Sequence, residues 1–235
     1  QSRAFRYLSE WARDKDYRVR RLASEGCRPR LPWAIQLPNL IANPAPILPI
    51  LEFLKDDKEE YVRRSVANNL NDIAKDHPDL VAEIVAKWMA GASPEREKLL
   101  RHASRTLLKQ GYRGILRTFG FDLPQNLSCA LNVGQKSISL GDTLTFELEL
   151  TSKNASTQNL MVDYAVHHMK ANGALKPKMF KLKVVSIKGG ETLKLKKRHP
   201  MRKITTRQYY PGKQELEIFL NGQAVAKQEF VLNVT

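Results

Sequence analysis

Two carboxylates stand in arginine-rich segments, and they are the first candidates for chemistry in this chain. Glu25 lies in ASEGCRPRLPW and is followed by Arg28 and Arg30, which an extended, proline-interrupted segment would direct to the same side. Asp72 lies in NNLNDIAKD, among three asparagines and a lysine. A carboxylate in such surroundings can be catalytic, but it is more often only one partner of a salt bridge. The residues by themselves leave both interpretations open.

Other kinds of chemistry find little support in the sequence. The five histidines show no HExxH spacing, and Cys27 and Cys129 are too far apart to suggest a zinc site or a disulfide framework. A glycine-rich phosphate loop and a nucleophile elbow are both missing from the sequence. We therefore expect neither a metal nor another cofactor. The cysteine usage fits a reducing, cytoplasmic setting, and we see no run as long as a membrane span and no signal leader.

The charge of the chain indicates the kind of partner. The formal net charge is +15, from 39 basic and 24 acidic residues in 235, which makes a polyanion the natural partner. Residues 1–124 hold 22 basic residues, of which 15 are arginine, whereas 14 of the 17 basic residues in 125–235 are lysine. Arginine suits positioned, bidentate phosphate contacts, and lysine suits a diffuse cationic surface. The two parts are therefore expected to meet a polyanion in different ways.

Residues 1–124 read as a helical repeat array. VRRLASEG from Val19 recurs as VRRSVANN from Val62, 43 residues later, and LLRHASRTLLKQG from Leu99 is a plausible third copy. This interval predicts HEAT-type helical pairs that stack into a curved solenoid. First helices are expected at 4–13, 46–55 and 80–90, and second helices from about residues 17, 59 and 94. No capping sequence precedes the first helix, so either upstream helices are missing or the protein is naturally short.

The second helix of the middle pair has an unusual polar side. Its apolar stripe is expected to face the core and consists of Val62, Val66, Leu70 and Ile73. The opposite side carries short amides and a carboxylate where a solvated helix normally carries long Glu and Lys pairs. Its members are Arg64, Asn68, Asn71, Asp72 and Lys75. This side is either a functional face or an ordinary solvated one. Among the tryptophans, Trp11 and Trp88 fall in apolar helical patterns and are predicted to lie in the core.

Residues 125–235 switch to a period of two, which indicates β-strands. Alternating runs such as TLTFELEL (143–150), MFKLKVVSI (179–187) and QELEIFL (214–220) are separated by Gly-Asp, Asn-Gly and Gly-Gly turns. Seven strands in about 110 residues predict an immunoglobulin-like β-sandwich, although the Cys, Trp, Cys signature is missing.

Basic residues concentrate on neighbouring strands of this region and on their loop. They are Lys181, Lys183, Lys194, Lys196, Lys197, Arg198, Arg202 and Lys203, and only Glu191 is expected to offset them. The cluster is either a phosphate grip or a solvated, solubilising face.

The two unusual motifs resemble a known family. ASEGCRPRLPW followed by YVRRSVANNLNDIAKDHPD is similar to the DNA alkylation repair family of HEAT-like glycosylases, in particular to its AlkC subgroup, in which the helical array precedes an immunoglobulin-like domain. The resemblance covers nearly the whole chain. It implies a monofunctional DNA glycosylase that hydrolyses the N-glycosidic bond of N3-alkylated adenine or cytosine in duplex DNA. It also implies binding on the concave surface and excision without base flipping.

The resemblance carries roles over to individual residues. Asp72 matches the acidic position of the NLND motif, Glu25 that of the SEG motif, and Trp33 the aromatic of RPRLPW. These three are the implied catalytic residues. The carboxylates would stabilise the cationic character of the sugar and orient water, while Trp33 would meet the cationic nucleotide. The residues predicted to bind DNA are Arg20, Arg21, Arg28, Arg30, Arg63, Arg64, Asn68, Asn71, Lys75, Arg101, Arg105, Lys181, Lys183, Lys194 and Lys196.

One departure from the family pattern keeps alternatives open. The family has a further active-site acid in a segment upstream of Gln1, and nothing in this sequence supplies it. Three hypotheses follow: an alkylbase glycosylase, a non-catalytic HEAT-repeat DNA-binding protein, and a protein-interaction scaffold. For the first we expect a bacterial, cytoplasmic monomer that associates with the nucleoid when bound to DNA.

Overall fold

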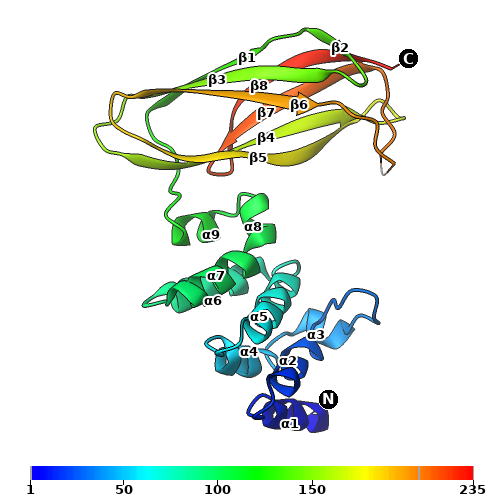
Figure 1. Cartoon of the computed structure of the whole chain (residues 1–235), viewed down its shortest axis with the longest axis vertical. Helices are drawn as coiled ribbons and strands as arrows, with labels where there is room; N and C mark the ends of the chain where they lie inside the picture. The colour runs from blue at the N-terminus through cyan, green and yellow to red at the C-terminus, as the bar shows by residue number, and fades with distance from the viewer. Residues whose placement is uncertain (1, 206, 235) are drawn as a thin grey trace. The chain divides into compact units, whose positions relative to one another are not determined.

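The computed structural model describes residues 2–205 and 207–234. The chain separates into a helical unit, 1–118, and a β unit, 119–235, and each is described by itself (Figure 1). The predicted boundary, between 124 and 125, lies slightly later. The segment before it belongs with the β unit, where Asn221 Nδ2 donates a hydrogen bond of 2.6 Å to the carbonyl oxygen of Asp122.

The helices of the helical unit follow the repeat pattern. The described bounds are α1 Ser2–Trp11, α2 Tyr17–Glu25, α3 Pro38–Ala42, α4 Leu48–Leu54, α5 Glu60–Ile73, α6 Pro78–Met89, α7 Pro94–Ala103, α8 Arg105–Lys109 and α9 Arg113–Thr118. The predicted second helices are α2, α5 and α7, and α5 packs against both of the others (Figure 1). The short helices α3, α8 and α9 were not predicted, because five or six residues are too few to show a helical period. The HEAT-type classification of the pairs stays a prediction.

Local sequence explains where two of the second helices, α2 and α7, begin. The carboxylate of Asp16 accepts a hydrogen bond of 2.8 Å from the backbone N–H of Arg18 and caps α2. Ser93 caps α7 in the same way, and Pro94 follows at the first helical position, where its missing N–H is harmless. The four apolar residues predicted for the core face of α5 are all buried. Helices α2 and α7 thus begin near the predicted residues, and the apolar side of α5 faces the core as predicted.

The β unit consists of two sheets. The strands are β1 Leu127–Val133, β2 Ser137–Ser139, β3 Thr143–Ser152, β4 Gln158–Met169, β5 Leu175–Ile187, β6 Thr192–Pro200, β7 Gly212–Leu220 and β8 Gln223–Asn233. One sheet has the order β1-β3-β6 and the other the order β2-β8-β7-β4-β5. Alternate residues such as Leu144, Phe146 and Leu148 are buried between them. The described residues thus form eight strands rather than seven, since the three-residue β2 was too short to recognise.

The sheet order corrects the prediction for the basic strands. Strand β5 lies at the edge of the five-stranded sheet and β6 at the edge of the three-stranded sheet, so their lysines do not share one ladder. Lys194 and Lys196 face the acidic residues of β3, with distances of 2.9 Å to Glu149 and 3.0 Å to Glu147. The expectation that Glu191 alone offsets the cluster was therefore wrong. Among the described residues, no helix is both long and apolar enough to span a membrane.

The two helical tryptophans differ in environment. Trp88 is 4% exposed, and its indole N–H donates a hydrogen bond of 2.7 Å to Glu52, as expected for a core residue. Trp11 is 39% exposed, so its predicted place in the core was wrong. It lies on α1, which packs mainly against α2, and one neighbouring helix cannot cover a ring of this size.

This difference predicts unequal costs of truncation. Trp88→Ala should lower the free energy of unfolding of the helical unit by about 3–5 kcal/mol, because it removes a buried ring and leaves a cavity. Trp11→Ala, the matched control, should cost less than about 1 kcal/mol. Denaturant unfolding followed by circular dichroism at a helical wavelength measures both. Equal losses in the two variants would show that the exposed ring is in fact packed in solution.

Candidate active site

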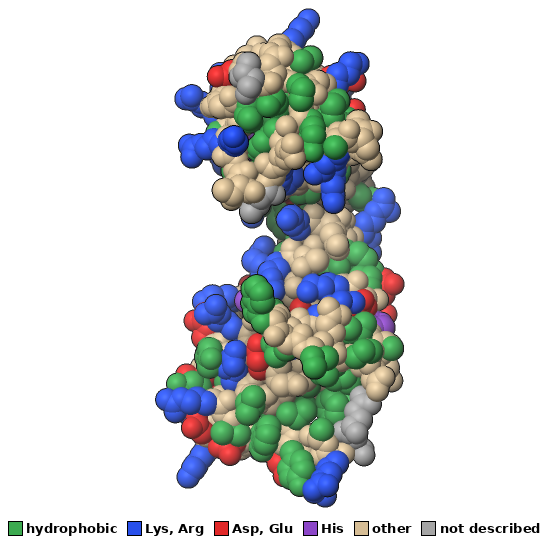
Figure 2. All heavy atoms as spheres, turned by 90° about the vertical axis from the view of Figure 1, so that its right-hand side faces the viewer, with side chains coloured by type: hydrophobic (Ala, Val, Ile, Leu, Met, Phe, Trp, Pro, Cys, Tyr) green, Lys and Arg blue, Asp and Glu red, His purple; other side chains and the backbone are tan. Residues whose placement is uncertain are grey.

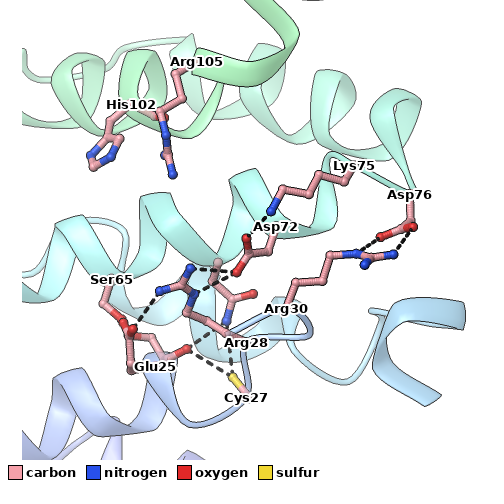
Figure 3. A network of polar contacts seen from close by, with 12 residues as sticks. Glu25, Cys27, Arg28, Arg30, Ser65, Asp72, Lys75, Asp76, His102 and Arg105 are labelled. Atoms are coloured by element: carbon pink, nitrogen blue, oxygen red, sulfur yellow. Dashed lines mark hydrogen bonds and ion pairs between the residues drawn. The ribbon is translucent and has the colours of Figure 1, made fainter. Parts of the chain in front are cut away.

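A buried guanidinium joins the two candidate carboxylates. Glu25 is the last residue of α2, Arg28 follows three residues later, and Asp72 lies near the end of α5. Arg28 Nη1 donates a hydrogen bond of 2.7 Å to Glu25 Oε1, while its Nε and Nη2 both lie 2.8 Å from Asp72 Oδ2 (Figure 3). The structure therefore brings the acids of the two motifs together around one cation.

Further hydrogen bonds from polar side chains of α2 and α5 support this cluster. Ser65 of α5 donates a hydrogen bond of 2.7 Å to Glu25 Oε2, and Ser24 donates one of 2.7 Å to Ser65. The side-chain amide of Asn69 donates one of 2.8 Å to the carbonyl oxygen of Ser24. Sequence reasoning missed Ser65 and Asn69, although both stand in the VRRSVANN repeat and could have been suspected from it. Because most of these acceptors are already occupied, the carboxylates are held in fixed orientations.

The polar side of α5 is only partly solvated, because Arg64 and Lys75 are exposed but its other members are not. Asp72 and Asn71 are almost completely buried, and Asn68 is half-buried. Asn71 Oδ1 accepts a hydrogen bond of 3.3 Å from the backbone N–H of Thr106 in α8. Of the two alternatives left open by the sequence, an ordinary solvated face is therefore wrong for Asn71 and Asp72. The helix lies between α2 and α7, so both of its sides are covered.

Lys75 is the exposed partner of the cluster. Its ammonium nitrogen lies 3.0 Å from Asp72 Oδ1, the oxygen that Arg28 does not hold. The side chain of Lys75 is 43% exposed, whereas that of Asp72 is 3% exposed. Asp72 thus has one buried cationic partner and one that water can reach.

Trp33 stands out from the helical unit on a short loop. Its side chain is fully exposed, and its backbone φ of 63° is in the left-handed region that non-glycine residues rarely adopt. The loop is closed by a hydrogen bond of 3.0 Å from the N–H of Leu37 to the carbonyl of Pro29. Arg30 anchors it to the chain just after α5 through two bonds of 2.7 and 2.8 Å to Asp76. The loop therefore presents the indole to solvent from a fixed base.

A basic groove of about 460 Å³ lies between α5 and α7. Its lining includes four of the arginines predicted to bind DNA, namely Arg63, Arg64, Arg101 and Arg105, together with Lys98, His102 and two glutamates. Burial and the neighbouring charges of Arg105 and Arg64 lower the pKa of His102. His102 and Arg105 point toward α5 in Figure 3. His102 was not predicted as a site residue, because nothing in its local sequence distinguishes it.

Several predicted DNA contacts are engaged inside the protein. Arg20 is buried, forms bonds of 2.6 and 3.0 Å to Asp57, and donates to two backbone carbonyls before α2. Arg28 is buried in the acidic cluster. The side chains of these two and of Asn71 are enclosed, which disfavours a direct DNA contact, and their predicted DNA binding stays a prediction. Arg21 lies 3.4 Å from Glu25 and over the ring of Tyr61.

The exposed charge differs between the two units. Figure 2 shows Lys and Arg side chains on the visible face of both units, with Asp and Glu mainly in the helical unit. Lys181 and Lys183 are exposed on β5. Among the described residues, no group of three or more His, Cys, Asp or Glu could hold a metal ion. Burial raises the pKa of the Cys27 thiol to about 12, so it stays protonated and is a poor nucleophile.

The site and fold can now be compared with known proteins. Residues 2–112 match the family described as DNA alkylation repair enzyme. Residues 128–234 match the family described as the C-terminal Ig-like domain of the uncharacterised protein YhaZ. The helical unit of the chain therefore belongs to the DNA alkylation repair enzyme family. The two matches, in this order along the chain, together with the two relatives described next, support the AlkC/YhaZ subgroup.

Two relatives cover nearly all of the chain. The uncharacterized protein YhaZ of Bacillus subtilis (strain 168) is 38% identical over 231 residues, which span 98% of this chain and 64% of that protein. The alkylpurine DNA glycosylase AlkC of Pseudomonas fluorescens, solved bound to DNA containing an abasic site analog, is 37% identical with a TM-score of 0.93. That match covers 99% of this chain and 65% of AlkC. The chain thus spans just under two thirds of the length of both relatives.

The Arg20–Asp57 pair generates a prediction about stability rather than binding. Arg20→Met should cost about 3–5 kcal/mol, because it leaves the carboxylate of Asp57 buried and unpaired. The double variant Arg20→Met, Asp57→Leu should recover part of this loss, since no lone charge remains. Arg20→Met should leave the salt dependence of duplex binding unchanged, whereas Arg64→Gln in the groove should reduce that slope by about 0.9.

The same pair sets a pH dependence. Burial by itself raises the pKa of Asp57, but hydrogen bonds from Arg20 and from the N–H of Glu59 outweigh it and hold the pKa below its usual value. A lowered folded-state pKa contributes stability above the unfolded value of about 3.9, and this is lost as the pH falls through the folded value. Thermal unfolding between pH 3 and pH 7 should therefore show that the parent loses stability more steeply than the double variant as the pH falls. Parallel curves would contradict this role.

Proposed function

We propose that this chain carries the catalytic carboxylates of a DNA glycosylase that removes alkylated bases from duplex DNA. The reaction is hydrolysis of the N-glycosidic bond, and N3-alkylated adenine or cytosine are the proposed substrates. The observation that carries this proposal is the convergence of Glu25 and Asp72 on Arg28, beside a basic groove. The similarity to AlkC over 99% of the chain supports the same activity.

The chemistry follows from the charge of the lesion. Alkylation makes the base cationic and therefore a good leaving group, so positive charge moves onto the deoxyribose as the bond breaks. A carboxylate fixed in advance near that charge stabilises the transition state, and it can also orient the attacking water. Glu25 and Asp72 are held by hydrogen bonds in the free protein, so little reorganisation is needed. Neither group has to become a covalent nucleophile in this scheme.

Trp33 supplies the aromatic part of the site. An indole face attracts a cation, and the attraction is stronger than with the other aromatic side chains. The ring of Trp33 is free of protein contacts over its whole surface and stands on a loop that begins just after Arg28. We propose that it packs against the cationic nucleotide while the carboxylates face the sugar.

Excision without base flipping is part of the proposal. Enzymes that extrude a base usually stack it between aromatic side chains in a snug pocket. The described residues that line the groove between α5 and α7 include no Phe, Tyr or Trp, and half of them are Lys or Arg. This lining suits a phosphate backbone better than a flipped base. The arginines of the groove would then hold the duplex in register.

The β unit adds a diffuse cationic surface in this proposal. Lys181 and Lys183 are exposed on β5 and are offered as phosphate contacts. Lys194 and Lys196 already pair with glutamates on β3, so they contribute less net charge to such a contact.

One observation favours a second candidate, a DNA-binding protein without catalysis. Asp72 has two cationic partners, Arg28 and Lys75, and Glu25 shares Arg28, so much of the acidic charge is neutralised inside the protein. An assay for release of N3-methyladenine from methylated duplex DNA separates the two. Release above the spontaneous rate supports the glycosylase, and tight, salt-dependent binding without release supports the alternative.

The role of Asp72 can be tested by removing its charge. Asp72→Asn should lower the single-turnover rate of base release about a hundredfold, because one preorganised electrostatic partner is lost. Glu25→Gln should act in the same direction, more mildly. Asp56→Asn is the matched control, since Asp56 also pairs with an arginine, Arg96, but lies outside the cluster. Rates are compared below the unfolding temperature of each variant. A folded Asp72→Asn protein with the parent rate would remove Asp72 from the mechanism.

Trp33 should separate activity from stability. Trp33→Ala should reduce release of cationic bases by about tenfold, in line with a lost interaction of roughly 1–2 kcal/mol between a cation and a ring. Its melting temperature should stay within about 2 °C of the parent, because the side chain packs against nothing. A large drop in melting temperature with an unchanged rate would return this residue to a structural role.

A further inference from the structure

The two oxygens of Asp72 are held in different ways. Oδ2 receives both Nε and Nη2 of Arg28, whose side chain is 8% exposed. Oδ1 receives only the ammonium of Lys75, at 3.0 Å, from a side chain that is 43% exposed. The first partner is enclosed by the fold, and the second reaches the carboxylate from solvent (Figure 3).

Arg28 and Lys75 should therefore differ in how easily each is displaced from Asp72. Removing Arg28 would expose two enclosed carboxylates to each other, which is strongly unfavourable. Lys75 lies beyond the end of α5 and pairs back over three residues, and ion pairs with an exposed partner contribute little free energy. Its flexible four-carbon stem can move the ammonium into water without disturbing the backbone. Of the two ion-pair partners of Asp72, Lys75 is thus the displaceable one.

We propose that Lys75 is an internal counter-ion that occupies the place of the substrate's positive charge and is displaced from Asp72 by a cationic nucleotide. This inference rests on the proposed function. In the free protein the ammonium neutralises Asp72 Oδ1. A cationic base or a sugar with developing positive charge can replace the ammonium at that oxygen, because it restores the same attraction. A neutral nucleotide cannot, so its approach would leave the Lys75 pair in place.

The proposal differs from the phosphate contact predicted for Lys75 from the sequence. A lysine that binds phosphate adds to the affinity for any duplex, damaged or not. A lysine that competes with the lesion for Asp72 lowers the affinity for cationic groups only. The two roles therefore predict opposite effects of removing the Lys75 charge on the affinity for a cationic duplex.

The test measures binding of two duplexes that differ in one charge. One duplex contains a pyrrolidine abasic analogue, which is cationic at neutral pH, and the other contains the neutral tetrahydrofuran analogue. Lys75→Met keeps most of the side-chain length and removes the charge. It should raise the preference for the cationic duplex about twofold to fivefold, the range expected when an exposed ion pair is removed. Lys75→Arg should restore the parent preference.

Lys98→Met is the matched control. Lys98 is also exposed and pairs with a glutamate, Glu60, at 3.0 Å, but it lines the basic groove and not the acidic cluster. It should weaken binding of both duplexes equally and leave the preference unchanged. The same result for Lys75→Met would overturn the proposal and assign Lys75 to phosphate. An unchanged affinity for both duplexes would also overturn it.

Failure of the underlying function gives a different result. If the parent protein releases no base from methylated duplex, the proposed glycosylase activity fails, whatever the binding preference shows. If the parent releases the base and Lys75→Met does not change the preference, only the role of Lys75 fails. In an active protein, Lys75→Met should also speed release of N3-methyladenine at subsaturating protein by a similar factor, since the competitor has been removed.

Discussion

The guanidinium of Arg28 is the constraint on which the candidate site depends. Two carboxylates from separate helices are enclosed near each other, and like charges in such a place repel strongly unless a cation lies between them. Arg28 fills that position with three donors directed at two acceptors. It also fixes the path of the chain after α2. The acidic cluster and the backbone that leads to the Trp33 loop are thus held by one side chain.

The same segment is anchored a second time a little further on. Arg30 binds Asp76 through two hydrogen bonds, just as Arg28 binds Asp72 one helical turn earlier. Two arginine–aspartate pairs therefore anchor the start of the loop to α5 and to the residues just after it. This explains how a strained, fully exposed tryptophan can be presented from a defined position. Because of this rigidity, the backbone that carries the aromatic ring and the carboxylates keep their relative placement.

Charge that is counted in a sequence is not the same as charge that is available to a partner. The helical unit is rich in arginine, yet Arg20 and Arg28 are enclosed with aspartates and Arg30 and Arg96 are paired. Four further arginines line the groove between α5 and α7. In the β unit, part of the lysine charge is balanced across β3 and β6. The cationic surface available to a polyanion is therefore smaller than the net charge suggests, and it is concentrated in particular places.

The sequence by itself determined the elements. A period of 3.6 and a repeat interval of 43 residues located α2, α5 and α7, and a period of two located all the strands but the shortest. The motifs around Glu25 and Asp72 also indicated the family. Only the tertiary structure decided which polar residues are enclosed. A periodic pattern shows that Asp72 lies opposite the apolar stripe of α5, but it cannot show that α2, α7 and the Arg28 segment cover that side. The pairs 20–57, 28–72 and 30–76 are each about forty residues apart, and they exist because α2 packs against α5. Burial of a charge depends on its partner, and the partner is supplied by packing between helices rather than by local sequence.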